Sequence, residues 1–402
     1  MSDITTRVKA KAQLAAIKVI MRVMPAPRPL VLVGADSSLQ LCATIAQLGV
    51  KRVLVVTDAV LYQLGVIQPI ETELQQHGIN TTIYSGVTPD PTFSVVEAGL
   101  VLLKSSGCDS VLAIGGGSAI DAAKVIALSA SNQKTPQQLV GILKARKASL
   151  PLFVIPTTAG TGSEVSAGAV VSDDQTHQKG LVLDTKLVPL ATALDPVIMQ
   201  GMPKSVTADT GLDALTHALE AWMSEFASSE SDFYAGAAVR LIFENLPTAW
   251  ADGRNLAARE AMALASHYAG LAMNQTALGY IHAIAHQLGA YYGVPHGRAN
   301  SIVMPHILEF NRQASEKRLA LLAERAGVVI GHFSSAQATD LFIQRVKSLL
   351  HELEIDSRIP RIDSKDFPAI IKGAFAEAHG IYAVPKYMTT LDAEKILHAL
   401  KS

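Results

Sequence analysis

Short apolar runs alternate with amphipathic stretches over the first half of the chain, up to about residue 194. Segments such as residues 94–103 and 121–129 have apolar side chains at helical spacing. Strands that alternate with helices of this length predict βαβ units and a mainly parallel, Rossmann-like sheet. The runs typical of strands are residues 30–33, 52–57, 81–84, 110–114 and 152–156.

Beyond residue 196 the apolar pattern is helical to the end of the chain, with no strand signal comparable to that of the first half. The boundary between the two patterns predicts an α/β domain over residues 30–198 and an all-helical domain over residues 199–402. The helices are expected at residues 203–224, 228–246, 255–272, 278–291, 300–312, 316–327, 335–353, 364–378 and 391–400.

Composition narrows the class of protein. The chain has 402 residues, of which 49 % are apolar and 17 % charged, as in globular proteins. A net charge of −1 gives no basic field to attract nucleic acid or an anionic membrane, and no apolar run approaches the roughly 18 residues of a membrane span. Cys42 and Cys108 alone form neither a disulfide framework nor a thiolate metal site. These features predict a cytoplasmic protein with no nucleic-acid or membrane partner.

Residues 1–29 form a separate, basic segment. A basic amphipathic start is compatible with an organellar presequence, but a surface helix ended by a run of prolines is the favoured interpretation. The segment up to residue 30 carries six basic residues against the single acid Asp3, namely Arg7, Lys9, Lys11, Lys18, Arg22 and Arg28.

Two glycine-rich turns follow predicted strands. The first, residues 115–118, is Gly-Gly-Gly-Ser and opens a helix, although its spacing is neither G-x-G-x-x-G nor that of a Walker A loop. The second, residues 156–164, holds four hydroxyls and two glycines within seven positions. Glycines allow close backbone approach, helix N-termini offer free N–H groups to phosphate, and hydroxyls bind phosphate or ribose. Two such turns after parallel strands favour a dinucleotide site over two structural turns.

Asp58 ends the predicted strand at residues 52–57. An acid in this place either binds a ribose diol or caps the helix that begins near Ala59. In the usual fingerprint the acid follows the glycine loop by about 20 residues. Here it precedes the loop, so spacing leaves both roles open.

The helical half contains a group of metal-ligand residue types. Asp213 and His217 are four residues apart, as are His282 and His286, so each pair lies on one face of its helix. His296 follows in a predicted loop between a proline and a glycine. One carboxylate and several imidazoles form a donor set for a divalent transition metal, and spacing does not choose between His282 and His286. Glu220, on the same helix as His217, is expected to support a ligand or form a structural ion pair.

From about residue 30 onward, these motifs together resemble the iron-containing, or group III, alcohol dehydrogenase family. The resemblance implies an α/β dinucleotide-binding domain followed by an all-helical metal-binding domain, as in the related dehydroquinate synthase fold. The family resemblance rests on the motifs at residues 115–118, 156–164, 194–196, 210–220, 278–289 and 295–297.

The resemblance also implies roles for individual residues. The metal ligands would be Asp213, His217, His282 and His296, with Fe²⁺ as the favoured metal and Zn²⁺ as an alternative. His286 would lie beside the nicotinamide and act in catalysis. NAD is the expected cofactor, since Asp58 would repel the 2′-phosphate of NADP. Its contacts would come from Asp58, Gly116, Gly117, Ser118, Asp121, Thr157, Thr158, Thr161 and Lys179. A homodimer or larger homo-oligomer is expected.

Several positions depart from the family pattern and bear on the substrate. Met273 stands where an aromatic residue is common, and it is expected to line the substrate pocket. The usual Asn-Pro-Arg near the C-terminus is Val384-Pro385-Lys386, and an Asp-containing stretch before it is replaced by residues 377–379. Leu190 also replaces a common Asp. These differences leave the alcohol unidentified.

The predicted function is hydride transfer between a small, primary alcohol or its aldehyde and NAD. The first alternative is a dehydroquinate-synthase-like or glycerol-dehydrogenase-like enzyme that also depends on NAD and a metal. A phosphorylated sugar acid requires a basic pocket, for which the helical half offers at most Arg298 and Lys204 near the predicted ligands. The apolar Met273, Leu278 and Ile281 suit a neutral alcohol better. A second alternative is a non-enzymatic NAD-binding protein, for which loss of the metal residues would change only stability.

Overall fold

The computed structural model describes residues 13–14, 18, 27–176 and 178–401, so most of the basic segment 1–29 lies outside the described residues. The chain divides into two compact units. The α/β unit comprises Pro25–Met202 with Gly253–His267, and the helical unit contains Pro203–Asp252 with Tyr268–Ser402. Among the described helices, none is both long and apolar enough to cross a bilayer.

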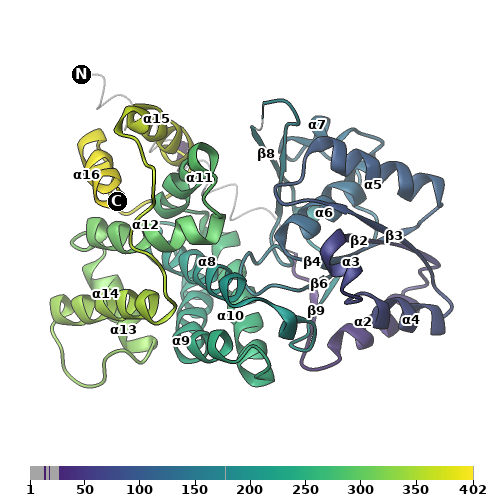
Figure 1. Ribbon diagram of the computed structural model, residues 1–402, viewed down its shortest axis with the longest axis horizontal. Coiled ribbons are helices and arrows are strands. Elements are labelled where there is room, and N and C mark those ends of the chain that lie inside the picture. The colour runs from purple at the N-terminus through teal and green to yellow at the C-terminus, as the bar shows by residue number, and fades with distance from the viewer. Residues whose placement is uncertain (1–12, 15–17, 19–26, 177, 402) are drawn as a thin grey trace. The chain divides into compact units, whose positions relative to one another are not determined.

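The α/β unit is built on a six-stranded sheet in which all neighbouring strands are parallel (Figure 1). The five strands expected from the sequence are confirmed. A sixth, β9, was missed because its sequence Ala-Thr-Ala-Leu is short and weak in β-branched residues. In spatial order the strands are β1 (Leu30–Val33), β9 (Ala191–Leu194), β6 (Leu152–Pro156), β4 (Ser110–Gly115), β2 (Arg52–Asp58) and β3 (Asn80–Val87).

Helices cover both faces of this sheet (Figure 1). Alternate residues of β2 show the division: Leu54 and Val56 belong to one core, and Val53 and Val55 to the other, since successive side chains of a strand point to opposite faces. The first core is closed by α5 (Phe93–Ser105) and α6 (Gly117–Asn132), and the second by α2 (Ser37–Gln47) and α4 (Gln68–Gln76).

A second, three-stranded sheet in the same unit was not predicted. Its order is β5-β8-β7, with β8 (Lys179–Leu183) antiparallel to β7 (Gly168–Ser172) and parallel to the two-residue strand β5 (Gly141–Ile142). The short helices α3 (Ala59–Gln63) and α7 (Pro136–Leu139) and the 3₁₀ turns Thr185–Leu187 and Ile198–Gly201 complete the connections.

The expected helices of the second half are present. The central one, α8 (Lys204–Met223), is buried on nearly all sides from Gly211 onward. It packs against α9 (Ser229–Ala251) and α12 (His296–Asn311). Residues from α10 (Leu256–Thr276) belong to both units. The others are α9 (Ser229–Ala251), α11 (Tyr280–Tyr292), α12 (His296–Asn311), α13 (Glu316–Arg325), α14 (Ser335–Glu352), the 3₁₀ turn Ser364–Asp366, α15 (Phe367–Ala378) and α16 (Thr390–Leu400).

The start of α12 differs from the expectation. The helix begins at His296, with Pro295 as its N-cap, rather than near residue 300. Proline and glycine around His296 indicated a loop, but both are compatible with a first helical turn. Gly297 is required by packing, since a Cβ atom there would lie 2.2 Å from the carbonyl oxygen of Asp209 on α8. The sequence pattern could not show this contact because it joins two helices far apart in the chain.

Candidate metal and cofactor sites

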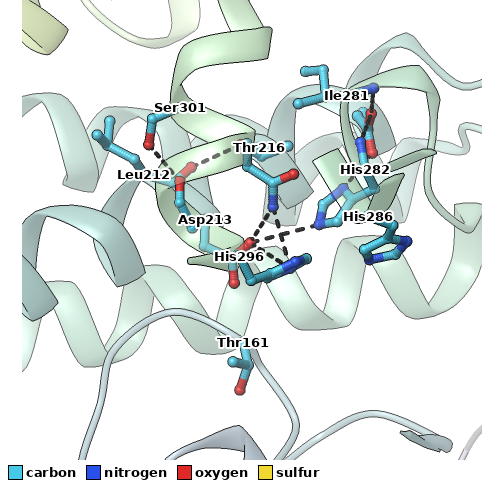
Figure 2. A network of polar contacts seen from close by, with 12 residues as sticks. Thr161, Leu212, Asp213, Thr216, Ile281, His282, His286, His296 and Ser301 are labelled. Atoms are coloured by element: carbon cyan, nitrogen blue, oxygen red, sulfur yellow. Dashed lines mark hydrogen bonds and ion pairs between the residues drawn. The ribbon is translucent and has the colours of Figure 1, made fainter. Parts of the chain in front are cut away.

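Three of the predicted metal ligands converge within the helical unit. Asp213 and His217 lie one turn apart on α8. His282, on α11, lies close to Asp213 (Figure 2). One possible ligand atom from each residue lies within 4.8 Å of the others. All three side chains are buried, and the imidazole rings of His217 and His282 stack with centroids 4.7 Å apart. One carboxylate oxygen and two imidazole nitrogens are thus close enough to one another to hold a single metal ion.

Two nitrogen atoms of this group lack hydrogen-bond partners. Both Nδ1 of His217 and Nε2 of His282 are buried without a hydrogen-bond partner among the described residues, and Nε2 of His282 lies 3.6 Å from Oδ1 of Asp213, beyond hydrogen-bond distance. A buried polar atom left unpaired costs about 1–3 kcal/mol, so it calls for an explanation. Imidazole nitrogens are common ligands of divalent transition metals, and the residues therefore fit such a cation.

Glu220 fixes the orientation of His282. Its Oε2 atom lies 2.7 Å from Nδ1 of His282 and also accepts the backbone N–H of Gly279 at 2.7 Å, while Oε1 accepts the N–H of Ile281 at 2.7 Å. The carboxylate thereby satisfies the first turn of α11, where free N–H groups attract negative charge. Because Nδ1 of His282 donates to Glu220, the neutral form of the ring carries its lone pair on Nε2. Of the two roles expected for Glu220, the structure shows the ion pair, which it forms with His282.

Burial and the neighbouring carboxylates have opposite effects on the pKa values of the buried imidazoles. Burial lowers the pKa of His217 to about 4. Burial acts in the same direction on His282, but Glu220 and Asp213 outweigh it and raise the pKa of His282 to about 10. Burial acts to raise the pKa of Asp213, yet the neighbouring imidazoles hold it well below its usual value. The two buried carboxylates, Asp213 and Glu220, therefore favour positive charge among the imidazoles, as expected where a cation is bound.

The fourth predicted ligand, His296, is placed differently. Its Nε2 atom lies 3.3 Å from Oδ1 of Asp213, but its side chain is 39 % exposed and it is not part of the compact three-residue group. Asn300, one turn further along α12, donates from Nδ2 to Oδ1 of Asp213 at 2.8 Å and lies 3.2 Å from Nε2 of His296. Asn300 was not predicted from the sequence, although its i,i+4 spacing from His296 was a usable signal.

His286 lies beside these residues without joining them. Its ring stacks on that of His296, with centroids 5.2 Å apart (Figure 2). Its Nδ1 atom lies 2.8 Å from Oε1 of Glu377. The hydroxyl of Tyr382 donates to the same carboxylate oxygen at 2.7 Å. Burial lowers the pKa of His286 despite the carboxylate, so the ring is neutral near pH 7. No sequence spacing links His286 to Glu377, which had stood out only as a departure from the family pattern.

The two glycine-rich turns are brought together in the α/β unit. They follow the adjacent strands β4 and β6, where Gly115 is paired with Pro156 and its carbonyl accepts the N–H of Thr157 at 3.0 Å. A Cβ atom on Gly117 would lie 2.8 Å from Cγ2 of Thr161, so only glycine permits this approach. The carboxyl ends of neighbouring parallel strands are where such sheets bind nucleotides.

The remaining cofactor candidates lie in the same unit. Asp58 ends β2, next to β4, and its Oδ1 atom accepts the N–H of Leu61 at 2.9 Å, so the capping role is confirmed. Ser118 is in the first turn of α6 and Asp121 in the second. Lys179, on β8, is 44 % exposed and forms an ion pair of 3.3 Å with Asp90.

Comparison with known proteins agrees with this architecture. Residues 29–196 match the family model "Iron-containing alcohol dehydrogenase", and residues 207–401 match "Fe-containing alcohol dehydrogenase family, C-terminal". The chain is 35 % identical over 371 residues to the NAD-dependent methanol dehydrogenase of Bacillus methanolicus, covering 92 % of this chain and 97 % of that protein.

Two further relatives show the same relationship. The chain is 37 % identical over 336 residues to the 1,3-propanediol dehydrogenase of Citrobacter freundii, covering 83 % of this chain and 87 % of that protein. The solved structure of an alcohol dehydrogenase from Oenococcus oeni superposes with a TM-score of 0.90 at 31 % identity, covering 94 % of this chain and all of that one. The family models together span almost the whole of the described chain, and the chain belongs to the iron-containing alcohol dehydrogenase family.

Proposed function

We propose that this member of the family transfers a hydride between a small primary alcohol and NAD, with the metal held by Asp213, His217, His282 and His296. The observation that carries the proposal is the buried group of three donors with two unpaired imidazole nitrogens. Family membership supports iron as the metal and NAD as the cofactor. Zinc remains chemically compatible with three nitrogens and one oxygen.

The chemistry divides between the bound groups and the chain. When bound, the divalent cation supplies Lewis acidity at the substrate oxygen, and NAD supplies the hydride acceptor. His286 is suited to pass the hydroxyl proton because its Nδ1 is engaged by Glu377, which leaves Nε2 as the atom that accepts a proton. Tyr382 holds the Glu377 carboxylate in place from the other side. The same groups return the proton when an aldehyde is reduced.

The cofactor residues are proposed on the geometry of the strand ends. Gly116, Gly117 and Ser118 open α6 and present backbone N–H groups suited to the pyrophosphate. Asp58 has one oxygen in its helix cap and a charge suited to a ribose diol. We further propose that Thr157, Thr158 and Thr161, on the second turn, and Lys179 contact the phosphates, riboses or nicotinamide side.

The alternative enzyme class is less well supported by the same structure. An anionic sugar acid needs cations that are free to bind it. Arg298 is engaged by Asp209, with Nε 2.7 Å from Oδ1, and Lys204 lies over the ring of Trp250 at 4.6 Å. Both basic candidates are therefore occupied within the helical unit, which favours a neutral substrate. Met273 is partly buried in α10 and is proposed to line the pocket for that substrate.

The test is alcohol oxidation by protein reconstituted anaerobically with Fe²⁺. Wild type should produce NADH from a panel of short primary alcohols, whereas His282→Ala should bind little iron and show no activity above background. Glu230→Ala, an exposed substitution on α9, serves as the control. A wild-type protein that is silent toward every alcohol and aldehyde in the presence of iron would refute the proposal.

Two properties of the whole molecule are also proposed. Other members of the family suggest a homodimer or larger homo-oligomer, which sedimentation would establish. The free, buried thiols Cys42 and Cys108 are compatible with a cytoplasmic location.

A further inference from the structure

Helix α6 presents two charged residues to the second glycine-rich turn. Asp121 and Lys124 are three positions apart, so they lie on one face of the helix. The Lys124 side chain is wholly buried. Its ammonium donates to the hydroxyl and carbonyl oxygens of Ser166, both at 2.9 Å, to the carbonyl of Gly168 at 2.8 Å and to the hydroxyl of Ser163 at 3.1 Å. A single buried cation therefore gathers three residues of the segment that follows β6.

Asp121 binds the same segment from the neighbouring turn of α6. Its Oδ1 atom accepts the hydroxyl of Ser163 at 2.6 Å, and its Oδ2 atom accepts the backbone N–H of Val170 at 2.8 Å. The Ser163 hydroxyl thus accepts from Lys124 and donates to Asp121, which joins the two charges through one side chain. Both carboxylate oxygens of Asp121 already accept hydrogen bonds from the protein.

A third contact holds the opposite side of the segment. Glu164, next to Ser163, is buried, and its Oε1 atom lies 3.1 Å from Nδ1 of the buried His267 on α10. His267 is thus an interior histidine whose Nδ1 atom is engaged by a buried carboxylate. Contacts from buried side chains therefore hold residues 163–170 in place. This stretch directly follows the threonines proposed to bind the cofactor.

The energetics indicate that this arrangement serves geometry more than stability. Burying an ammonium costs several kcal/mol unless it is fully hydrogen-bonded, and well-packed apolar side chains would often stabilise a fold equally well. Hydrogen bonds from a charged group are directional, so they fix a loop in one conformation. A loop that is already ordered binds its ligand more tightly because less conformational entropy is lost on binding.

We propose that Asp121 and Lys124 are positioning residues that hold residues 157–168 in the conformation that binds the dinucleotide, a role that rests on the proposed function of that loop. They act on the cofactor through Ser163 and Ser166 rather than by touching it. This assigns to Asp121 a role different from the direct contact expected from the family resemblance, and it gives Lys124 a role that the sequence did not indicate.

The experiment is a fluorescence titration of NADH against the full chain, which requires no turnover. Lys124→Met should weaken NADH binding at least tenfold, raise the KM for NAD and leave the KM for alcohol and the bound iron unchanged. Hydrogen exchange of residues 157–170 should become faster. Lys104→Met, at an exposed position on α5, should match wild type in each measurement.

Two further variants keep the proposal testable if Lys124→Met fails to fold. Ser163→Ala removes the hydroxyl that joins the two charges and should also weaken NADH binding. Thr158→Ala tests the loop assignment itself. If Thr158→Ala weakens binding while folded Lys124→Met and Ser163→Ala bind NADH within twofold of wild type, the positioning role is refuted and the loop assignment survives. If none of the three weakens binding, both are refuted.

Discussion

The Nδ1 atom of His282 lies 2.7 Å from Oε2 of Glu220, and both side chains are buried. The same carboxylate accepts backbone N–H groups at the start of α11, so it fixes the helix and the tautomer of its histidine together. Supporting carboxylates of this kind typically contribute about 10–100-fold to metal affinity. We therefore expect metal binding at the proposed site to depend on Glu220, which does not itself belong to the donor group.

Replacement of Glu220 by Gln should therefore reduce iron affinity by roughly ten- to a hundredfold while the protein remains folded. The amide keeps the shape of the carboxylate, but it has one acceptor oxygen instead of two and no negative charge. It therefore cannot accept hydrogen bonds from both Nδ1 of His282 and all of the helix N–H groups. Equilibrium dialysis followed by metal analysis gives the measurement. Glu244→Gln, on the exposed face of α9, is the matched control. Unchanged iron affinity in Glu220→Gln would show that His282 needs no partner.

His296→Ala should lower iron affinity without a large loss of stability. Its side chain is 39 % exposed, so truncation leaves little cavity, whereas His282 is buried among the other donors. The free energy of unfolding from urea titration should differ from wild type by less than about 1 kcal/mol for the metal-free protein. Retention of wild-type iron affinity would exclude His296 as a ligand.

Asp58→Ser should shift cofactor preference toward NADP. A serine can still cap α3 through its hydroxyl, but the negative charge that would oppose a 2′-phosphate is removed. The ratio of kcat/KM for NADP to that for NAD should rise at least tenfold. Asp58→Glu retains the charge and should keep the preference for NAD. An unchanged ratio in the serine variant would assign Asp58 to the helix cap alone.

Lys124 should make stability depend on pH in alkaline solution. Burial lowers its pKa from 10.5 to about 8, against the opposing effects of Asp121 and Glu164. The positive charge of Lys179, on β8, contributes to lowering the pKa of Asp121. Between these two values the unfolded chain binds more protons than the folded one, so the free energy of unfolding increases as pH rises.

The full shift corresponds to on the order of 3 kcal/mol, most of it gained above pH 8. Urea titrations of wild type and Lys124→Met at pH 7 to 9.5 provide the measurement. The free energy of unfolding of wild type minus that of Lys124→Met should increase as pH rises across this range. A constant difference would mean that the Lys124 ammonium keeps its usual pKa in the folded protein.

Met273→Trp should restrict the substrate to shorter alcohols. Met273 is partly buried in α10, and a larger rigid side chain removes volume from the proposed pocket. One methylene of substrate typically changes kcat/KM by about 10–200-fold in a fitted pocket. The ratio of kcat/KM for 1-butanol to that for ethanol should therefore fall, with Met273→Leu as the volume-conserving control. The same ratio in both variants would place Met273 outside the pocket.

Local patterns in the sequence were sufficient for much of the architecture. Apolar periodicity identified five of the parallel strands and the helices of the second half, because strands and amphipathic helices impose their own spacing. The i,i+4 spacing of Asp213 and His217 placed both on one face of α8. The family resemblance, rather than spacing, chose His282 over His286, and the structure places His282 in the compact donor group.

Only the tertiary structure revealed the groups that support these residues. Glu377 meets His286 across 91 positions, and Lys124 meets Ser166 across 42, so neither pair leaves a local pattern in the sequence. The second sheet was also missed, since β5 has only two residues and its pairing depends on chain segments far apart. Periodicity reports which face of an element is buried, but it does not report what that face meets. Residues far apart in the chain become neighbours through packing, and here packing determines the tautomer, the charge and the orientation of the groups proposed to act.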